Sequence, residues 1–177
     1  GKTTLAIREM LRFASKPNQT IWYLAPSYRM AKEIVFTKLC SIIHDLRWVK
    51  KVNQSELTVY LKNGSIISLK GAENFDSLRG RAINFLILDE FADIKPQAFY
   101  EVLRPALSDT NGHALFTGTP KSKSNWSYDL FNMSSVDPEH WDSWQYTTLA
   151  GGFVTESEIE EARELLDART FTQEYEA

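Results

Sequence analysis

Apolar residues spaced three and four positions apart predict most of the helices in this chain. Four helices are expected, over residues 5–14, 28–46, 96–107 and 156–168. The first is ended by a polar stretch that contains Pro17, and the third begins with Pro96, a residue that the first turn of a helix accepts. The fourth is preceded by Thr155, and Glu158 follows three residues later, which is the spacing of a capping box.

Short runs rich in apolar and aromatic residues predict strands between these helices. They cover residues 20–25, 57–61, 65–69, 85–88, 114–116 and 143–148. The run at 85–88 is apolar throughout, as expected of a parallel strand buried on both faces. Asn63 and Gly64 join two of the strands and favour a type I′ hairpin, in which both residues have positive φ. The alternation of strands and helices predicts an α/β fold: a mostly parallel sheet flanked by helices, with the hairpin as an antiparallel insertion.

Composition narrows the class of protein without pointing to a function. Of 177 residues, 43% are hydrophobic and 24% are charged, which excludes a disordered, collagenous or coiled-coil chain. The single cysteine, Cys40, excludes an internal disulfide and favours a reducing compartment. The apolar runs are far shorter than the ~20 residues that span a bilayer, so no membrane partner is expected. The net charge of −3 does not indicate bulk electrostatic binding of nucleic acid, although it allows a local basic strip.

The chain opens on Gly1-Lys2-Thr3, which matches the last part of the phosphate-binding loop G-x-x-x-x-G-K-[ST] at the head of a predicted helix. In such a loop, backbone N–H groups and the helix N-terminus bind phosphate oxygens. The lysine reaches the β and γ phosphates, and the hydroxyl ligates Mg²⁺. Three residues recur by chance, so this tripeptide alone favours an ordinary N-terminus over a nucleotide site.

Two carboxylates, Asp89 and Glu90, follow the buried run at 85–88. In P-loop enzymes an aspartate at such a strand end holds Mg²⁺, and a neighbouring glutamate can polarise the attacking water. An acidic pair is also common at a solvated strand end. The two motifs together are much rarer than either alone, and they favour nucleotide hydrolysis.

Two further segments have side chains suited to the same chemistry. The Thr-Gly-Thr tripeptide at 117–119 follows another buried strand, where its hydroxyl groups could sense a γ-phosphate; a plain β-turn is the alternative. Arg79 and Arg81 lie in the loop that leads to the acidic strand. An arginine there could neutralise transition-state charge, or it could be an ordinary surface residue.

In the order and spacing of these motifs, the sequence resembles the ATPase domain of the large terminase subunit, the DNA-packaging motor of tailed bacteriophages. The segments that carry the resemblance are Gly1-Lys2-Thr3, Ser77-Leu78-Arg79-Gly80, Phe85 to Glu90, Leu103 to Leu107, Ala114 to Pro120 and Phe171 to Tyr175. The resemblance covers nearly the whole chain. It implies a P-loop NTPase fold of the ASCE/RecA-like type. An ATPase core would occupy residues 1–149, and a small lid or linker over 150–177 would lead to a nuclease domain.

The resemblance also implies a role for each candidate residue. The nucleotide-binding residues, with ATP as the nucleotide, would be Gly1, Lys2, Thr3 and Thr4. Thr3 and Asp89 would hold Mg²⁺. Glu90 and Lys2 would be catalytic, as would Arg79, acting as an arginine finger offered to a neighbouring subunit. The motif that couples hydrolysis to DNA movement would be Thr117, Gly118 and Thr119.

The resemblance implies partners as well: double-stranded DNA, a portal protein on a procapsid, a small terminase subunit, and further copies of the chain in a ring. The expected location is the cytoplasm of a bacterial host. Nuclease activity is expected only of the full-length protein. Since the chain starts within the phosphate-binding loop, it is expected to be a piece of a longer phage or prophage protein. Such a piece is expected to bind ATP poorly by itself.

Two alternatives stay open at this point. A superfamily-2-type helicase or other DNA translocase has the same kinds of motif, but normally adds a second RecA-like domain. The other alternative is a catalytically inactive P-loop module for assembly or DNA binding. The joint presence of Lys2, Thr3, Asp89 and Glu90 argues against an inactive module.

Overall fold

The structure is a computed structural model, which describes residues 1–152 and 154–176. The chain divides into two compact units, Gly1–Gly118 and Thr119–Ala177. The expected ATPase core and lid, over 1–149 and 150–177, stay a prediction.

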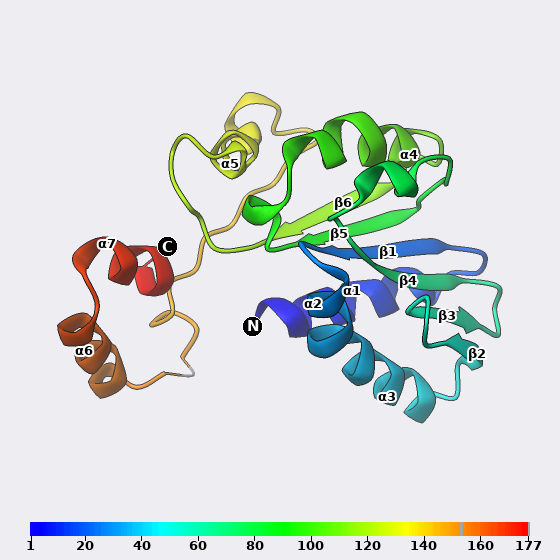
Figure 1. The fold of residues 1–177 in the computed structure, drawn as a ribbon, viewed down its shortest axis with the longest axis horizontal. Helices are drawn as coiled ribbons and strands as arrows, with labels where there is room; N and C mark the ends of the chain where they lie inside the picture. The colour runs from blue at the N-terminus through cyan, green and yellow to red at the C-terminus, as the bar shows by residue number, and fades with distance from the viewer. Residues whose placement is uncertain (153, 177) are drawn as a thin grey trace. The chain divides into compact units, whose positions relative to one another are not determined.

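A six-stranded mixed sheet forms the centre of the first unit (Figure 1). Its strands are β1 (Thr20–Ala25), β2 (Val49–Asn53), β3 (Thr58–Leu61), β4 (Ile66–Gly71), β5 (Phe85–Asp89) and β6 (His113–Thr117). They lie in the order β2-β3-β4-β1-β5-β6. β1 pairs in parallel with β4 and with β5, and β5 pairs in parallel with β6. β3 is antiparallel to both of its neighbours. The carboxyl ends of four parallel strands therefore share one edge of the sheet.

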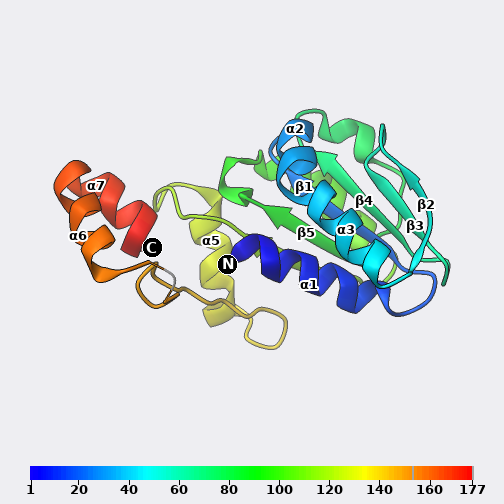
Figure 2. The same ribbon diagram turned by 90° about the horizontal axis from the view of Figure 1, so that it is seen from below.

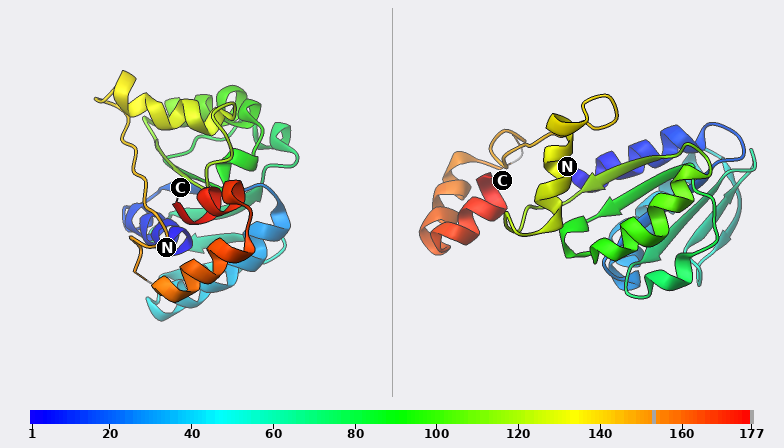
Figure 3. Two further views of the ribbon diagram at one scale, coloured as in Figure 1. Left: turned by 90° about the vertical axis from the view of Figure 1, so that its left-hand side faces the viewer. Right: turned by 90° about the horizontal axis from the view of Figure 1, so that it is seen from above.

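Helical segments cover both faces of this sheet. Those before β5 are α1 (Lys2–Ala14), α2 (Tyr28–Met30), η1 (Ala31–Phe36), α3 (Thr37–Asp45) and η2 (Phe75–Leu78). Those after β5 are η3 (Phe91–Asp93), η4 (Ala98–Leu103) and α4 (Arg104–Ser108). α1 and α3 lie on one face, as Figure 2 shows, and η4 and α4 lie on the other (Figures 1 and 3). The predicted α/β architecture is confirmed.

The face that carries α1 holds the main hydrophobic core. Ile7 and Met10 of α1 are buried there with Tyr23 of β1 and Ile87 of β5. Tyr23 and Ile87 are directly paired in the parallel register, so they lie on the same face of the sheet. The helix predicted over 28–46 is continuous from α2 through the π-helical η1 to α3.

The predicted hairpin is present, but two details of that prediction are wrong. Gly64 has φ of 86° whereas Asn63 does not have positive φ, so the turn is not type I′. The Asn63 side chain instead donates to the carbonyl oxygens of Ala14, at 2.8 Å, and Lys16, at 3.2 Å, at the end of α1. The second strand, β4, belongs to the parallel part of the sheet and not to an antiparallel insertion, because it pairs in parallel with β1 and its Ile67 is fully buried.

The second unit is helical. It contains α5 (Trp126–Val136), α6 (Glu156–Leu165), α7 (Ala168–Phe171) and η5 (Thr172–Glu176). The capping box between Thr155 and Glu158 is confirmed at the start of α6. A small core joins Ile159 and Ala162 of α6 to Phe171 of α7.

The strand predicted over 143–148 is wrong: these residues have no regular secondary structure. Trp144 is 65% exposed and Tyr146 is 73% exposed. Aromatic residues favour strands because they pack well on a half-buried sheet surface. Trp144 and Tyr146 do not lie in a sheet, so this preference has no effect here. The helix predicted over 156–168 also ends early, because Leu166 is extended and Asp167 caps the separate helix α7.

Candidate active site

Asp89 and Glu90 stand where the central strand β5 ends. Asp89 is the last residue of β5 and is only 6% exposed. Glu90 follows in the left-handed region, with φ of 47° and ψ of 43°, and leads into η3. This conformation is costly for a residue with a side chain, and such outliers concentrate at functional sites. The backbone therefore turns sharply between the two carboxylates.

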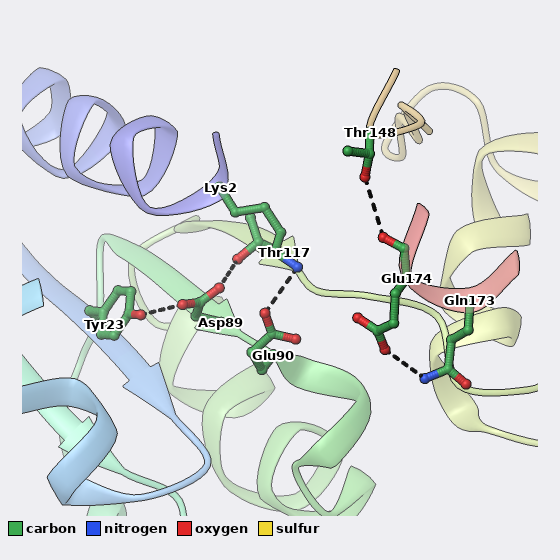
Figure 4. A network of polar contacts seen from close by, with 8 residues as sticks. All are labelled: Lys2, Tyr23, Asp89, Glu90, Thr117, Thr148, Gln173 and Glu174. Carbon is green, nitrogen blue, oxygen red and sulfur yellow. Dashed lines mark hydrogen bonds and ion pairs between the residues drawn. The ribbon is translucent and has the colours of Figure 1, made fainter. Parts of the chain in front are cut away.

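Asp89 accepts hydrogen bonds from both neighbouring strands, as Figure 4 shows. Thr117 of β6 is its direct partner in the register, and the Thr117 Oγ1 donates to Asp89 Oδ1 at 2.6 Å. From the other side, the Tyr23 hydroxyl of β1 donates to Asp89 Oδ2. Each carboxylate oxygen thus has a donor on a rigid strand, which compensates the burial of its charge.

Tyr23 is a functional candidate that the sequence pattern did not single out. Its side chain is 1% exposed. Burial, and then the hydrogen bond to Asp89, raise the pKa of the Tyr23 phenol far above its ordinary value of 10.0, so this group remains a proton donor in the hydrogen bond. The sequence signal was a tyrosine within an otherwise apolar strand. Its partner became apparent only with the register between β1 and β5.

The first turn of α1 brings a lysine to the same edge of the sheet. Lys2 Nζ lies 2.9 Å from Glu90 Oε1, and the Lys2 and Glu90 side chains are 43% and 29% exposed. Gly1 is the N-cap residue of α1, and Thr3 and Thr4 follow Lys2 in the first turn. The N-terminus of this helix, with its N–H groups and the positive end of its dipole, is a favourable place for an anion.

Gly118 packs closely against the backbone after β5. A Cβ atom at this position would lie 3.4 Å from Glu90 Cα and 3.4 Å from Phe91 N. Thr117 and Gly118, two members of the predicted coupling motif, are thus tied respectively to Asp89 and to the backbone of Glu90. The third member, Thr119, is the first residue of the second unit.

The contacts of Arg79 lie elsewhere. Its guanidinium group is 3.1 Å from Asp76 Oδ1 and donates at 3.1 Å to the carbonyl oxygen of Glu101. The side chain is 52% exposed. The structure brings together Lys2, Asp89, Glu90, Thr117 and Gly118, with the first turn of α1 beside them. Arg79 of the same chain instead bonds to the residues before it and to η4.

The second unit has its own polar contacts at the end of the chain, which Figure 4 also draws. Thr148 Oγ1 donates to the carbonyl oxygen of Glu174 at 3.3 Å, and Gln173 Nε2 donates to Glu174 Oε1 at 3.0 Å. Phe171 stacks on Tyr175 with ring centroids 5.1 Å apart. The segment from Phe171 to Tyr175 is therefore folded onto its own unit.

The fold and this group of residues define an α/β protein with a polar site at the carboxyl edge of parallel strands, where proteins of this class bind their ligands. The chain belongs to the terminase large subunit family. The model of that family described as "Terminase large subunit, T4likevirus-type, N-terminal" matches residues 1–177.

Curated relatives carry the same description. The chain is 33% identical to the terminase large subunit of Escherichia phage T5 over 182 aligned residues, covering all of this chain and 41% of that protein. It is 29% identical to the terminase large subunit of Thermus phage G20c over 153 residues, covering 75% of this chain and 31% of that protein. The chain thus spans less than half the length of these relatives.

Solved terminase structures share the fold. The large terminase ATPase domain of Thermus phage P74-26 matches with a TM-score of 0.87 at 24% identity, covering 99% of this chain and 83% of that one. The large terminase of another thermophilic bacteriophage, solved in complex with ADP, matches with a TM-score of 0.80 at 14% identity, covering 99% and 44%. In the part of this chain that the structure describes, no helix is both long and apolar enough to cross a bilayer.

Proposed function

We propose that this chain carries the ATP-hydrolysing site of a terminase large subunit, the motor that packages viral DNA. The observation that carries the proposal is the meeting of Lys2 and the Asp89–Glu90 pair at one edge of the sheet. These residues come from segments far apart in the sequence, and their types are those that phosphate binding and water activation need. The large terminase of a thermophilic bacteriophage that shares this fold has been solved with ADP and with ATP-γ-S. Those two complexes support ATP as the nucleotide.

Each residue has a role in this proposal. Gly1, Lys2, Thr3 and Thr4 bind the phosphates through the helix N-terminus, the lysine ammonium and the threonine hydroxyl groups. Glu90 accepts a proton from the water that attacks the γ-phosphate in line with the leaving oxygen. The left-handed backbone conformation of Glu90 turns the chain sharply after Asp89.

The donor set at this edge fits Mg²⁺ bound together with a nucleotide. Among residues 1–152 and 154–176, no group of three or more His, Cys, Asp or Glu side chains is placed to enclose a metal ion. Magnesium ordinarily takes only one or two carboxylates, with phosphates and waters completing its shell. Asp89 and Thr3 would hold it, and the ion would supply positive charge that stabilises the phosphate oxygens. This chain's own part is to orient the Asp89 carboxylate through the donors Thr117 and Tyr23.

Thr117, Gly118 and Thr119 are proposed to couple hydrolysis to DNA movement. Support comes from their placement: Thr117 bonds to Asp89, Gly118 packs on Glu90, and the second unit begins at Thr119. A movement of the Asp89 or Glu90 carboxylate would therefore be transmitted directly to Thr117 and Gly118, just before the second unit begins. We propose residues 150–177 as the lid, or the linker to a nuclease domain of the full-length protein.

Arg79 is proposed to act on a neighbouring subunit in a ring. Its exposure, and its contacts with Asp76 and Glu101 in place of Glu90, support action in trans. The proposed partners are double-stranded DNA, a small terminase subunit and the portal of a procapsid. All of them would be met in the cytoplasm of the bacterial host.

The test is ATP hydrolysis by the full-length protein with Lys2→Ala. Loss of the ammonium that binds the phosphates should lower turnover by about 10²–10³-fold, the effect of removing one charge-stabilising donor. Lys50→Ala, on the exposed face of β2, is the matched control and should leave turnover unchanged. Equal turnover in the Lys2 variant and wild type would overturn the proposal.

A further inference from the structure

We propose that Tyr23 is a positioning residue: its hydroxyl orients the Asp89 carboxylate for binding the magnesium–nucleotide complex. This inference rests on the proposed function, since it assigns Tyr23 to the same site. Tyr23 and Asp89 come from neighbouring strands, β1 and β5, and Tyr23 lies on the face of the sheet that carries α1. Their hydrogen bond is drawn in Figure 4.

Packing alone does not account for a tyrosine at this position. The ring is buried in the core with Ile7, Met10 and Ile87, where phenylalanine would fill the same space. A buried hydroxyl costs free energy unless it has a partner, and the partner here is the buried carboxylate at the end of β5. The Tyr23 hydroxyl is therefore not needed for packing of the core, and its contribution is the hydrogen bond to Asp89.

The two donors on Asp89 hold the plane of its carboxylate from opposite sides. Thr117 Oγ1 donates to Oδ1 at 2.6 Å and Tyr23 donates to Oδ2. An ionised carboxylate accepts about four hydrogen bonds or ligands in all, so both oxygens keep capacity for a metal or its waters. If Tyr23 loses its hydroxyl, Oδ2 loses its donor and the carboxylate can turn about its Cβ–Cγ bond.

This arrangement predicts that Tyr23→Phe weakens the Mg²⁺-dependent part of nucleotide binding and leaves binding without Mg²⁺ unchanged. Residues that hydrogen-bond a metal ligand change metal affinity or activity by about 10–100-fold when mutated. For Tyr23→Phe we expect the affinity of the full-length protein for ADP without Mg²⁺ to be unchanged. The gain in affinity produced by saturating Mg²⁺ should be smaller by about 10-fold.

The experiment is equilibrium binding of fluorescent ADP, first in EDTA and then with stepwise addition of Mg²⁺. Tyr28→Phe is the matched control, because it also removes one tyrosine hydroxyl, whose bond runs to the carbonyl oxygen of Ser55 at 3.0 Å. We expect this control to behave as wild type in both conditions. Unchanged binding in EDTA also reports that each variant is folded.

A double-mutant cycle with Asp89→Asn distinguishes positioning from packing. If Tyr23 acts through the Asp89 carboxylate, Tyr23→Phe should cause no further loss of Mg²⁺-dependent affinity in the Asp89→Asn background. An equal loss in both backgrounds would overturn the inference, as would a normal gain with Mg²⁺ in Tyr23→Phe alone. If wild type itself shows no gain with Mg²⁺, the proposed function fails, and this inference with it.

Discussion

The Lys2 ammonium and the Glu90 carboxylate form an ion pair of 2.9 Å between the first turn of α1 and the residue after β5. The two side chains are the proposed ligand of the phosphates and the proposed base. A phosphate that binds Lys2 must therefore compete with Glu90 for the same ammonium, and binding should release the carboxylate for water.

The ion pair predicts that Glu90→Gln binds nucleotide more tightly than wild type. Both partners are partly exposed, so their attraction amounts to about 0–1 kcal/mol, and the affinity for ADP should rise by up to about 5-fold. The gain should shrink at high salt, which screens the pair. Calorimetry on the full-length protein measures both effects. Glu33→Gln, which alters an exposed pair with Arg29, is the control; a clear loss of affinity in Glu90→Gln would contradict this competition.

Arg79 predicts complementation between subunits. Arg79→Ala should bind ATP normally but hydrolyse it more slowly only where subunits assemble, by up to the ~10³–10⁵-fold typical of arginine fingers. Mixing it with Glu90→Gln subunits should restore activity, because a neighbour's intact Arg79 then reaches an intact Glu90. ATPase assays over a range of mixing ratios measure the recovery. Arg81→Ala is the matched control. If mixtures show only the sum of the two separate activities, Arg79 does not act in trans.

Asn63 predicts a stability effect far from the proposed site. Its amide donates to Ala14 O at 2.8 Å and to Lys16 O at 3.2 Å, and its Oδ1 accepts from the Ser65 N–H at 3.0 Å. None of these bonds is fully buried, so Asn63→Ala should cost about 0.5–1.5 kcal/mol of unfolding free energy for each bond lost. Gln19→Ala, which removes a single bond to Pro17 O, should cost less. Urea unfolding compares the two variants, and equal midpoints would refute this role for Asn63.

The helices and strands that could be predicted from the sequence are those in which burial sets the pattern of apolar residues. The apolar run at 85–88 forms all but the last residue of β5, and the run at 20–25 is β1 to the residue. Because β5 and β6 are parallel neighbours, residues that follow the two runs had to meet at one edge, and Asp89 and Thr117 do. The meeting of the acidic pair with Thr117 could therefore be predicted from the sequence pattern.

The features that could not be predicted from the sequence depend on the register between distant strands and on contacts between distant residues. β2 carries Lys50 and Lys51 at the edge of the sheet, so it lacks an apolar run. The bond from Tyr23 to Asp89 depends on the alignment of β1 with β5, which no local spacing encodes. The left-handed conformation of Glu90 is imposed by the turn into η3, against the preference of the residue.

Activation of water by Glu90, at the site that Lys2 and Asp89 form, is the central claim. Its most direct test is single-turnover hydrolysis of ATP by full-length Glu90→Gln, at protein concentrations that saturate binding. We expect retained ATP binding and a chemical step slower by about 10²–10⁴-fold, the effect of losing a general base. A chemical step within a few-fold of wild type, with ATP bound, would contradict the claim.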